Sequence, residues 1–184
     1  MQWTLHLDHL KDLERSGLTP DTIRRAGVYT VPPDEIGLKK NQRGLPEGVL
    51  SALAFPYPGF DGYERFKVWW EEGRTGPKYL AKAGTPNHFY FPPMVDLKGD
   101  SHLLLVEGEK KALALMQGGF QVVGIGGVWN WLTKGDDGNS HPLLDFDLVN
   151  WQRPVTILFD SDSAVNSNVR LAAWRLARVV AKRG

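Results

Sequence analysis

Apolar and polar positions in the second half of the chain follow two alternating patterns. Residues 102–106, 120–125 and 155–159 are nearly continuous apolar runs, which are typical of strands buried on both faces of a parallel sheet. Residues 109–117 and 166–182 instead predict helices, and one face of the second helix carries Val169, Ala172, Ala173, Leu176 and Val180. The order strand, helix, strand, strand, helix, with short connections, predicts a parallel sheet flanked by helices.

The first half of the chain predicts a smaller unit of mixed structure. Residues 4–27 predict two short helices, and Thr19-Pro20 stands where the second would begin. Strand patterns follow at residues 49–57 and 64–70, joined by the turn signal Phe60-Asp61-Gly62-Tyr63. These elements predict a small antiparallel sheet behind a helical lead-in.

We therefore expect two domains. A mixed α+β lobe occupies residues 1–98, with its antiparallel sheet at about residues 49–93, and an α/β domain occupies residues 99–184. Within the second domain, residues 133–142 are polar and rich in glycine and predict a mobile loop.

Composition narrows the classes of protein and of site. Hydrophobic residues make up 42% of the 184 residues and charged residues 23%, as in soluble globular proteins. No apolar run approaches the roughly 18 residues that span a bilayer, and the N-terminus does not resemble a signal peptide, so we expect a cytoplasmic protein without a membrane partner. The chain has no cysteine, which excludes disulfides and thiolate zinc sites and leaves oxygen or imidazole ligands for any metal.

Charge is distributed unevenly, although the net charge is only +1. Residues 99–162 hold nine acidic and four basic side chains, whereas residues 163–184 hold five basic side chains and no acidic one. An acidic centre beside a basic helix fits an enzyme that binds metal and phosphate. Solvated charge on a helix face explains the same helix equally well.

Three carboxylates follow predicted strands. Glu107 ends one strand, and Asp160 and Asp162 follow another. Ligands of open parallel sheets bind beyond the carboxyl ends of the strands, and Mg²⁺ prefers carboxylate oxygens, so the three side chains predict a Mg²⁺ site. Gly108 suits a tight turn after Glu107, and the helix that follows would direct its N-terminus at a phosphate.

An Asp-x-Asp pair alone is not specific, because many such pairs are turn residues or helix caps. A Walker B strand is excluded, since no GxxxxGK[ST] motif occurs in the chain. A phosphatase nucleophile would need lysine and acidic partners further along, and few residues follow Asp162. The combination of strand, Glu107, Gly108 and helix with a later strand and Asp-x-Asp is much more specific.

That combination resembles the TOPRIM domains of DnaG-type primases, topoisomerases and some nucleases. The matching segments are LLLVEGEKKA at 103–112 and TILFDSD at 156–162. The resemblance implies that Glu107 is a metal ligand or acid–base group and that Asp160 and Asp162 bind Mg²⁺, which Mn²⁺ could replace. All three residues are then the catalytic residues of phosphoryl transfer.

The preceding lobe extends the resemblance. The segments FPYPGFDGYERFK at 55–67 and GPKYLAKAGTPNHFYF at 76–91 resemble the basic lobe before TOPRIM in DnaG-type primases. Together with the TOPRIM motifs, they make the chain similar to the DUF3854 modules of phage and plasmid replication proteins. The resemblance implies that nucleic acid or nucleotide phosphates contact Arg65, Lys67 and Lys78, and we add Lys110, Lys111 and Arg170 because they lie on the two predicted helices.

The function implied is Mg²⁺-dependent nucleotidyl transfer, namely primer synthesis from nucleoside triphosphates on single-stranded DNA in mobile-element replication, beside a replicative helicase. Two alternatives stay open: a TOPRIM-type nuclease, and a non-catalytic single-strand-binding module of a replication helicase. TOPRIM domains usually continue beyond the point where this sequence stops, so we expect a C-terminally truncated domain.

Secondary candidates have competing structural interpretations. His88 and the Gly124–Gly127 run could contact phosphate, and Trp129 with Trp131 could stack on a base, but packing explains each of them too. Asp145 and Asp147 form a second Asp-x-Asp pair without an apolar strand before it, so we leave them out of the site.

Overall fold

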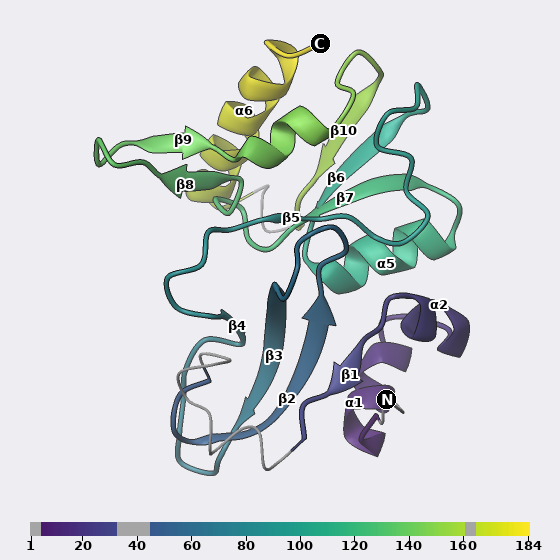
Figure 1. Cartoon of the computed structure of the whole chain (residues 1–184), viewed down its shortest axis with the longest axis vertical. Helices are drawn as coiled ribbons and strands as arrows, with labels where there is room; N and C mark the ends of the chain where they lie inside the picture. Colours follow the sequence, from purple (N-terminus) through teal and green to yellow (C-terminus); the bar gives the residue numbers. More distant parts are fainter. Residues whose placement is uncertain (1–4, 33–44, 161–164) are drawn as a thin grey trace. The chain divides into compact units, whose positions relative to one another are not determined.

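The structure is a computed structural model that describes residues 5–32, 45–160 and 165–184 (Figure 1). It divides into two compact units, Met1–Thr85 and Pro86–Gly184. The fold is mixed α/β, with an antiparallel sheet in the first unit and a mostly parallel sheet in the second, as the hydrophobic pattern predicts.

The first unit is an antiparallel sheet in the order β1-β2-β3-β4 with two helices before it. The helices are α1 (Leu7–Glu14) and α2 (Pro20–Arg25), and the strands are β1 (Tyr29–Thr30), β2 (Val49–Pro56), β3 (Glu64–Trp70) and β4 (Tyr79–Ala81). Strands β2 and β3 form the predicted hairpin, with Ala54 opposite Phe66. One buried cluster lies on one face of the sheet and contains Tyr29, Val31, Leu45, Val49, Ala52, Ala54, Phe66 and Val68. On the other face Leu53 and Phe55 of β2 are also fully buried.

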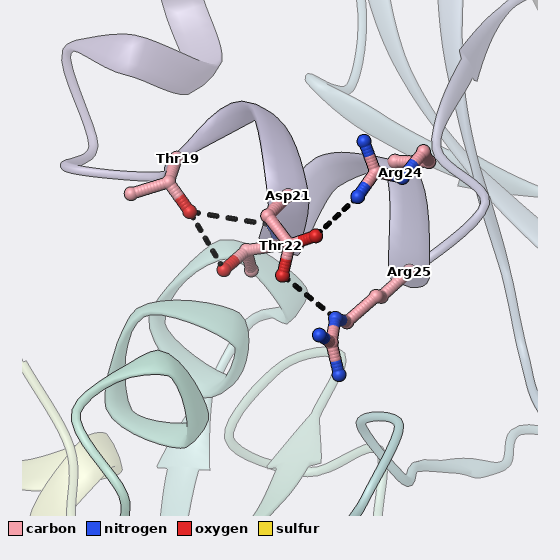
Figure 2. Close-up of polar contacts among 5 residues, drawn as sticks. All are labelled: Thr19, Asp21, Thr22, Arg24 and Arg25. Atoms are coloured by element: carbon pink, nitrogen blue, oxygen red, sulfur yellow. Dashed lines mark hydrogen bonds and ion pairs between the residues drawn. The ribbon is translucent and has the colours of Figure 1, made fainter.

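The short helix α2 is stabilised at its start by the predicted cap (Figure 2). The Thr19 hydroxyl accepts a hydrogen bond from the Thr22 backbone N–H at 3.3 Å, and Pro20 fills the first helical position, where no N–H is needed. Asp21 in the first turn pairs with Arg24 and, at 2.7 Å, with Arg25. These contacts supply stability that a six-residue helix lacks by itself.

A polar cluster fastens α1 to the sheet. His9 is 1% exposed, and its ring nitrogens lie 2.8 Å from the Thr30 hydroxyl on β1 and 3.1 Å from the Ser51 hydroxyl on β2. The ring also stacks on Trp69 of β3 at 4.3 Å. Burial, followed by the neighbouring His6, lowers the pKa of His9 to about 4, so the buried ring is neutral at pH 7.

The second unit contains a four-stranded sheet in the order β10-β6-β7-β5. Strands β6 (Leu103–Glu107), β7 (Gln121–Ile125) and β10 (Val155–Leu158) are parallel, and β5 (Phe89–Tyr90) joins β7 in the antiparallel sense. Helix α5 (Glu109–Gln117) connects β6 to β7, and α6 (Ser167–Ala181) follows β10. These strands and helices fall where the apolar runs and helical periodicity predict them. However, β10 is not buried on both faces as expected, because it is an edge strand whose residues are partly exposed.

Both faces of this sheet are covered. Gly124 of β7 faces α5, since a Cβ there would lie 3.1 Å from the Ala112 side chain. On the other face, Phe89 lies 4.8 Å from Phe146 of the 3-10 helix η1 (Leu144–Leu148). The end of α6 lies on this second face too, because the Arg183 guanidinium is 4.9 Å from the Phe146 ring. The predicted three-layer arrangement is therefore present.

Two expectations need correction. Residues 88–91 were expected in the antiparallel lobe, but Phe89 and Tyr90 are fully buried and pair with Ile125 and Gly124 of the second sheet. The boundary between the units consequently lies earlier than expected, after Thr85. The sequence predicts a loop at residues 133–142, but most of them belong to a hairpin of β8 (Leu132–Lys134) and β9 (Ser140–Pro142). The hairpin can contain many polar residues because it is largely exposed to solvent.

Candidate metal and nucleotide site

The carboxyl ends of β6 and β10 bring two of the predicted carboxylates to one edge of the sheet. In the parallel register, Val106 of β6 lies beside Leu158 of β10. Glu107, the last residue of β6, is therefore next to the point where the chain continues from β10 into Phe159 and Asp160. Glu107 is half-buried and Asp160 is exposed. Asp162, the third predicted ligand, lies outside the described residues.

Gly108 makes the sharp turn from β6 into α5. Its φ of 91° is in the region that favours glycine, and its N–H donates to the Ile125 carbonyl oxygen at 2.8 Å, so the chain turns directly at the strand end. Helix α5 begins at the next residue, which directs the N–H groups of its first turn toward the edge that holds Glu107. Such a helix start favours an anion.

Lys111, one turn into α5, makes an ion pair with Asp160. Both side chains are about half exposed, at 47% for Lys111 and 53% for Asp160. We had expected Lys111 to contact a phosphate, but in this conformation its ammonium group neutralises the Asp160 carboxylate. Lys110, its neighbour, is partly exposed.

The donor set at this edge fits Mg²⁺, because Glu107 and Asp160 offer hard oxygen ligands from adjacent strands. The ammonium of Lys111 shows that a cation is accommodated beside Asp160. Within residues 5–32, 45–160 and 165–184, no group of three His, Asp or Glu side chains lies close enough together to hold a metal ion. The predicted third carboxylate, Asp162, is outside these ranges.

His88 and Asp145 form a pair that the sequence did not predict. Asp145 is buried, accepts the Phe89 backbone N–H at 2.6 Å, and lies 3.2 Å from Nδ1 of His88. Because Phe89 is opposite Ile125, His88 lies level with the carboxyl end of β7. The sequence pattern gives no reason to place Asp145 in the site, because no apolar strand precedes it.

Two other candidates have clear packing roles. Gly124 has no room for a side chain, since Ala112 and Tyr90 both lie 3.1 Å from the position of a Cβ. Trp131 is buried and donates its indole N–H to the Val128 carbonyl oxygen at 2.9 Å. Trp129 stacks on Trp131 at 6.2 Å but is only partly buried.

The basic residues predicted on the first unit differ in accessibility. Lys67 is 6% exposed, pairs with Asp12 and lies 4.8 Å from the Trp69 ring. Arg65 is 7% exposed and lies 5.5 Å from the Tyr79 ring. Only Lys78 of the three is exposed to solvent. Arg170, the predicted contact on the second unit, is exposed on α6.

Residues 97–184 match the family described as "Domain of unknown function (DUF3854)". No curated protein matches the sequence. Among the helices that the structure describes, none has the length and apolar character that a membrane crossing requires.

Solved structures match both units of the chain together. The DnaG catalytic core is 21% identical at a TM-score of 0.55, with 95% of this chain and 60% of that chain covered. The DnaG primase catalytic domain bound to single-stranded DNA is 20% identical at a TM-score of 0.57, with 95% and 61% covered. The Aquifex aeolicus primase, represented by its zinc-binding and RNA polymerase domains, is 15% identical at a TM-score of 0.56, with 91% and 45% covered.

These identities are low, so the matches establish the fold. The chain has the fold of the DnaG catalytic core, as the resemblance of its motifs implied. It spans between 45% and 61% of the length of the chains that it matches.

Proposed function

We propose that this chain is a Mg²⁺-dependent nucleotidyltransferase that synthesises primers on single-stranded DNA during phage or plasmid replication. The observation that supports this most is the position of Glu107 and Asp160, on adjacent parallel strands at one edge of a sheet with the DnaG-core fold. A helix N-terminus, which favours phosphate, begins beside Glu107.

In this proposal Glu107, Asp160 and Asp162 hold Mg²⁺. The bound ion supplies charge neutralisation for the triphosphate and activation of the attacking 3′-hydroxyl. The first turn of α5 orients a phosphate through its backbone N–H groups. Lys111 moves from Asp160 to that phosphate, since an ammonium group and a divalent cation would repel each other at the same carboxylate.

Single-stranded DNA is the template and nucleoside triphosphates are the substrates, with a replicative helicase as the partner. Lys78, Lys110 and Arg170 are accessible enough to contact phosphates. We assign Lys67 and Arg65 a structural role instead, because both are buried and Lys67 would have to leave Asp12 to reach a phosphate. Removing Lys67 from that pair would leave a partly buried carboxylate without its cation.

The test is de novo synthesis by the full chain on single-stranded template, with nucleoside triphosphates and Mg²⁺ or Mn²⁺. We expect labelled primers from the wild type, and a loss of at least about a hundredfold in Glu107→Gln and Asp160→Asn, because each removes charge from the metal site. Asp136→Asn, an exposed acid on the β8–β9 hairpin, is the matched control and should keep full activity. Template cleavage in place of synthesis would favour a TOPRIM nuclease.

A second candidate function is a non-catalytic single-strand-binding module. The Lys111–Asp160 ion pair favours it, since a built-in cation at Asp160 removes part of the need for a metal. This candidate predicts that single-stranded DNA binds equally well in the presence of EDTA and that neither synthesis nor cleavage occurs. Binding without chemistry, in the wild type and in Asp160→Asn alike, would replace the first proposal.

A further inference from the structure

The outer face of α6 exposes large side chains that the core does not use. Leu171 is 41% exposed and Trp174 is 56% exposed. Both lie opposite the buried face of the helix, which consists of Val169, Ala172, Leu176 and Val180. An exposed tryptophan next to an exposed leucine offers an apolar surface that a binding partner could cover.

Arginines cover the aromatic rings on this side of the helix. The Arg178 guanidinium lies 4.8 Å from the Trp174 ring, and the Arg175 guanidinium lies 5.7 Å from the Trp129 ring. Both distances are within the range of a cation–π interaction. We call Trp129, Leu171, Trp174, Arg175 and Arg178 the α6 strip.

The Trp129 end of the α6 strip is held in place. Its indole N–H donates to the Asn168 side-chain oxygen on α6 at 3.1 Å. Its ring stacks on Trp131 at an interplanar angle of 28°, and Trp131 is only 2% exposed. One edge of the strip is thus anchored to the folded core, which keeps the Trp129 ring in a fixed position.

The positive charge of the α6 strip favours a negatively charged partner. Residues 163–184 contain five basic residues and no acidic one, so α6 offers its arginines no carboxylate of its own. A partner that supplies both negative charge and flat aromatic faces would match the strip. Single-stranded nucleic acid supplies both, with phosphates for the guanidinium groups and unstacked bases for the rings.

We propose that the α6 strip is a stacking site for single-stranded nucleic acid, with a base on Trp174 and phosphates on Arg175 and Arg178. Leu171, Trp174 and Arg178 lie on successive turns and extend over about 10 Å of helix, which is enough for a short stretch of the strand. The proposal shares its class of partner with the proposed function, but it requires neither a metal ion nor catalysis.

The test is fluorescence anisotropy of a labelled oligothymidylate titrated with the full chain in EDTA. Trp174→Ala should weaken binding about five- to a hundredfold, the range for losing one base–aromatic stack. Trp174→Phe should retain most of the affinity, since it keeps an aromatic face. Phe120→Ala is the matched control, because Phe120 is 53% exposed on the same unit but lies outside the strip.

Charge is tested separately. Arg178→Gln should lower the slope of log affinity against log salt by about 0.7, the change for one phosphate contact on a single strand. Lys134→Gln, an exposed base on the β8–β9 hairpin, should leave the slope unchanged. Because Trp174 and Arg178 are exposed, these variants should keep the wild-type melting temperature, which confirms that they fold.

Failure of this proposal is distinguishable from failure of the proposed function. Asp160→Asn should abolish synthesis but bind the oligonucleotide as tightly as the wild type. Equal affinity of Trp174→Ala and the wild type would overturn the α6 strip as a nucleic-acid site, whatever the synthesis assay shows. If Trp174→Ala instead abolished self-association measured by sedimentation, with DNA affinity unchanged, the strip would be an interface between copies of this chain.

Discussion

Acidification should lower the free energy of unfolding because His9 is buried as a neutral ring. The burial of this ring sets the size of the effect. The pKa of His9 is lowered from 6.5 to about 4 in the folded protein, mainly by burial. Between these two values the unfolded chain binds a proton that the folded chain does not bind. Stability is therefore fully present above pH 6.5 and is lost as the pH falls toward 4.

The magnitude follows from the two pKa values. At about pH 5, an unfolded pKa of about 6.5 and a folded pKa of about 4 correspond to a loss of about 2 kcal/mol, whereas at about pH 7.5 the loss is close to zero. Both ring nitrogens face hydroxyl groups, those of Thr30 and Ser51, and the ring stacks on Trp69. The neighbouring Asp12 and Asp8 carboxylates act in the opposite direction, but more weakly than burial.

The assay is urea denaturation of the wild type and of His9→Gln at these two pH values. Glutamine cannot gain the proton, so the variant should be less stable at about pH 7.5 but should lose about 2 kcal/mol less than the wild type on acidification. His102→Gln is the control, because His102 is exposed on the second unit. If the wild type and His9→Gln lost equal stability on acidification, the assignment of the effect to His9 would be wrong.

Three further predictions test the fold and the site. Thr19→Ala should lower the free energy of unfolding by about 1 kcal/mol through loss of the α2 cap, and Thr19→Ser should restore most of it. Gly124→Val should destabilise the second unit by about 1–3 kcal/mol in thermal unfolding, because Ala112 and Tyr90 leave no space for a side chain. Lys111→Gln should tighten Mn²⁺ binding up to about fivefold, the equivalent of an exposed ion pair, in a titration followed by electron paramagnetic resonance. Lys110→Gln should leave Mn²⁺ affinity unchanged, and weaker binding in Lys111→Gln would refute competition at Asp160.

The sequence predicted best the strands and helices whose apolar residues form one clear pattern, either a continuous run or a helical repeat. Buried parallel strands have no polar face, so β6 and β7 appear as continuous apolar runs, and α6 appears as an amphipathic helix. The glycine after Glu107 predicted the turn into α5 for a local reason, the positive φ that glycine allows. These local signals also placed Glu107 and Asp160 at the correct strand ends.

What the sequence did not predict depends on contacts between distant residues. The aromatic segment around Phe89 has the same local pattern in either sheet, and its pairing with β7 and its burial against Phe146 assign it to the second. From the sequence, Lys67 is expected to be an accessible cation on a strand. In the structure it pairs with Asp12, which is 55 positions away in the chain. The Lys111–Asp160 pair likewise forms only when β10 lies beside β6.

The position of a bound divalent cation would show whether Glu107 and Asp160 form a metal site. Crystals of the full chain soaked in Mn²⁺ and measured for anomalous scattering would locate the ion without any assumption about activity. We predict an anomalous peak at the sheet edge, bound by Glu107 and Asp160, which disappears in Asp160→Asn. Crystals with no peak at that edge, or with Mn²⁺ only at sites remote from both carboxylates, would contradict it.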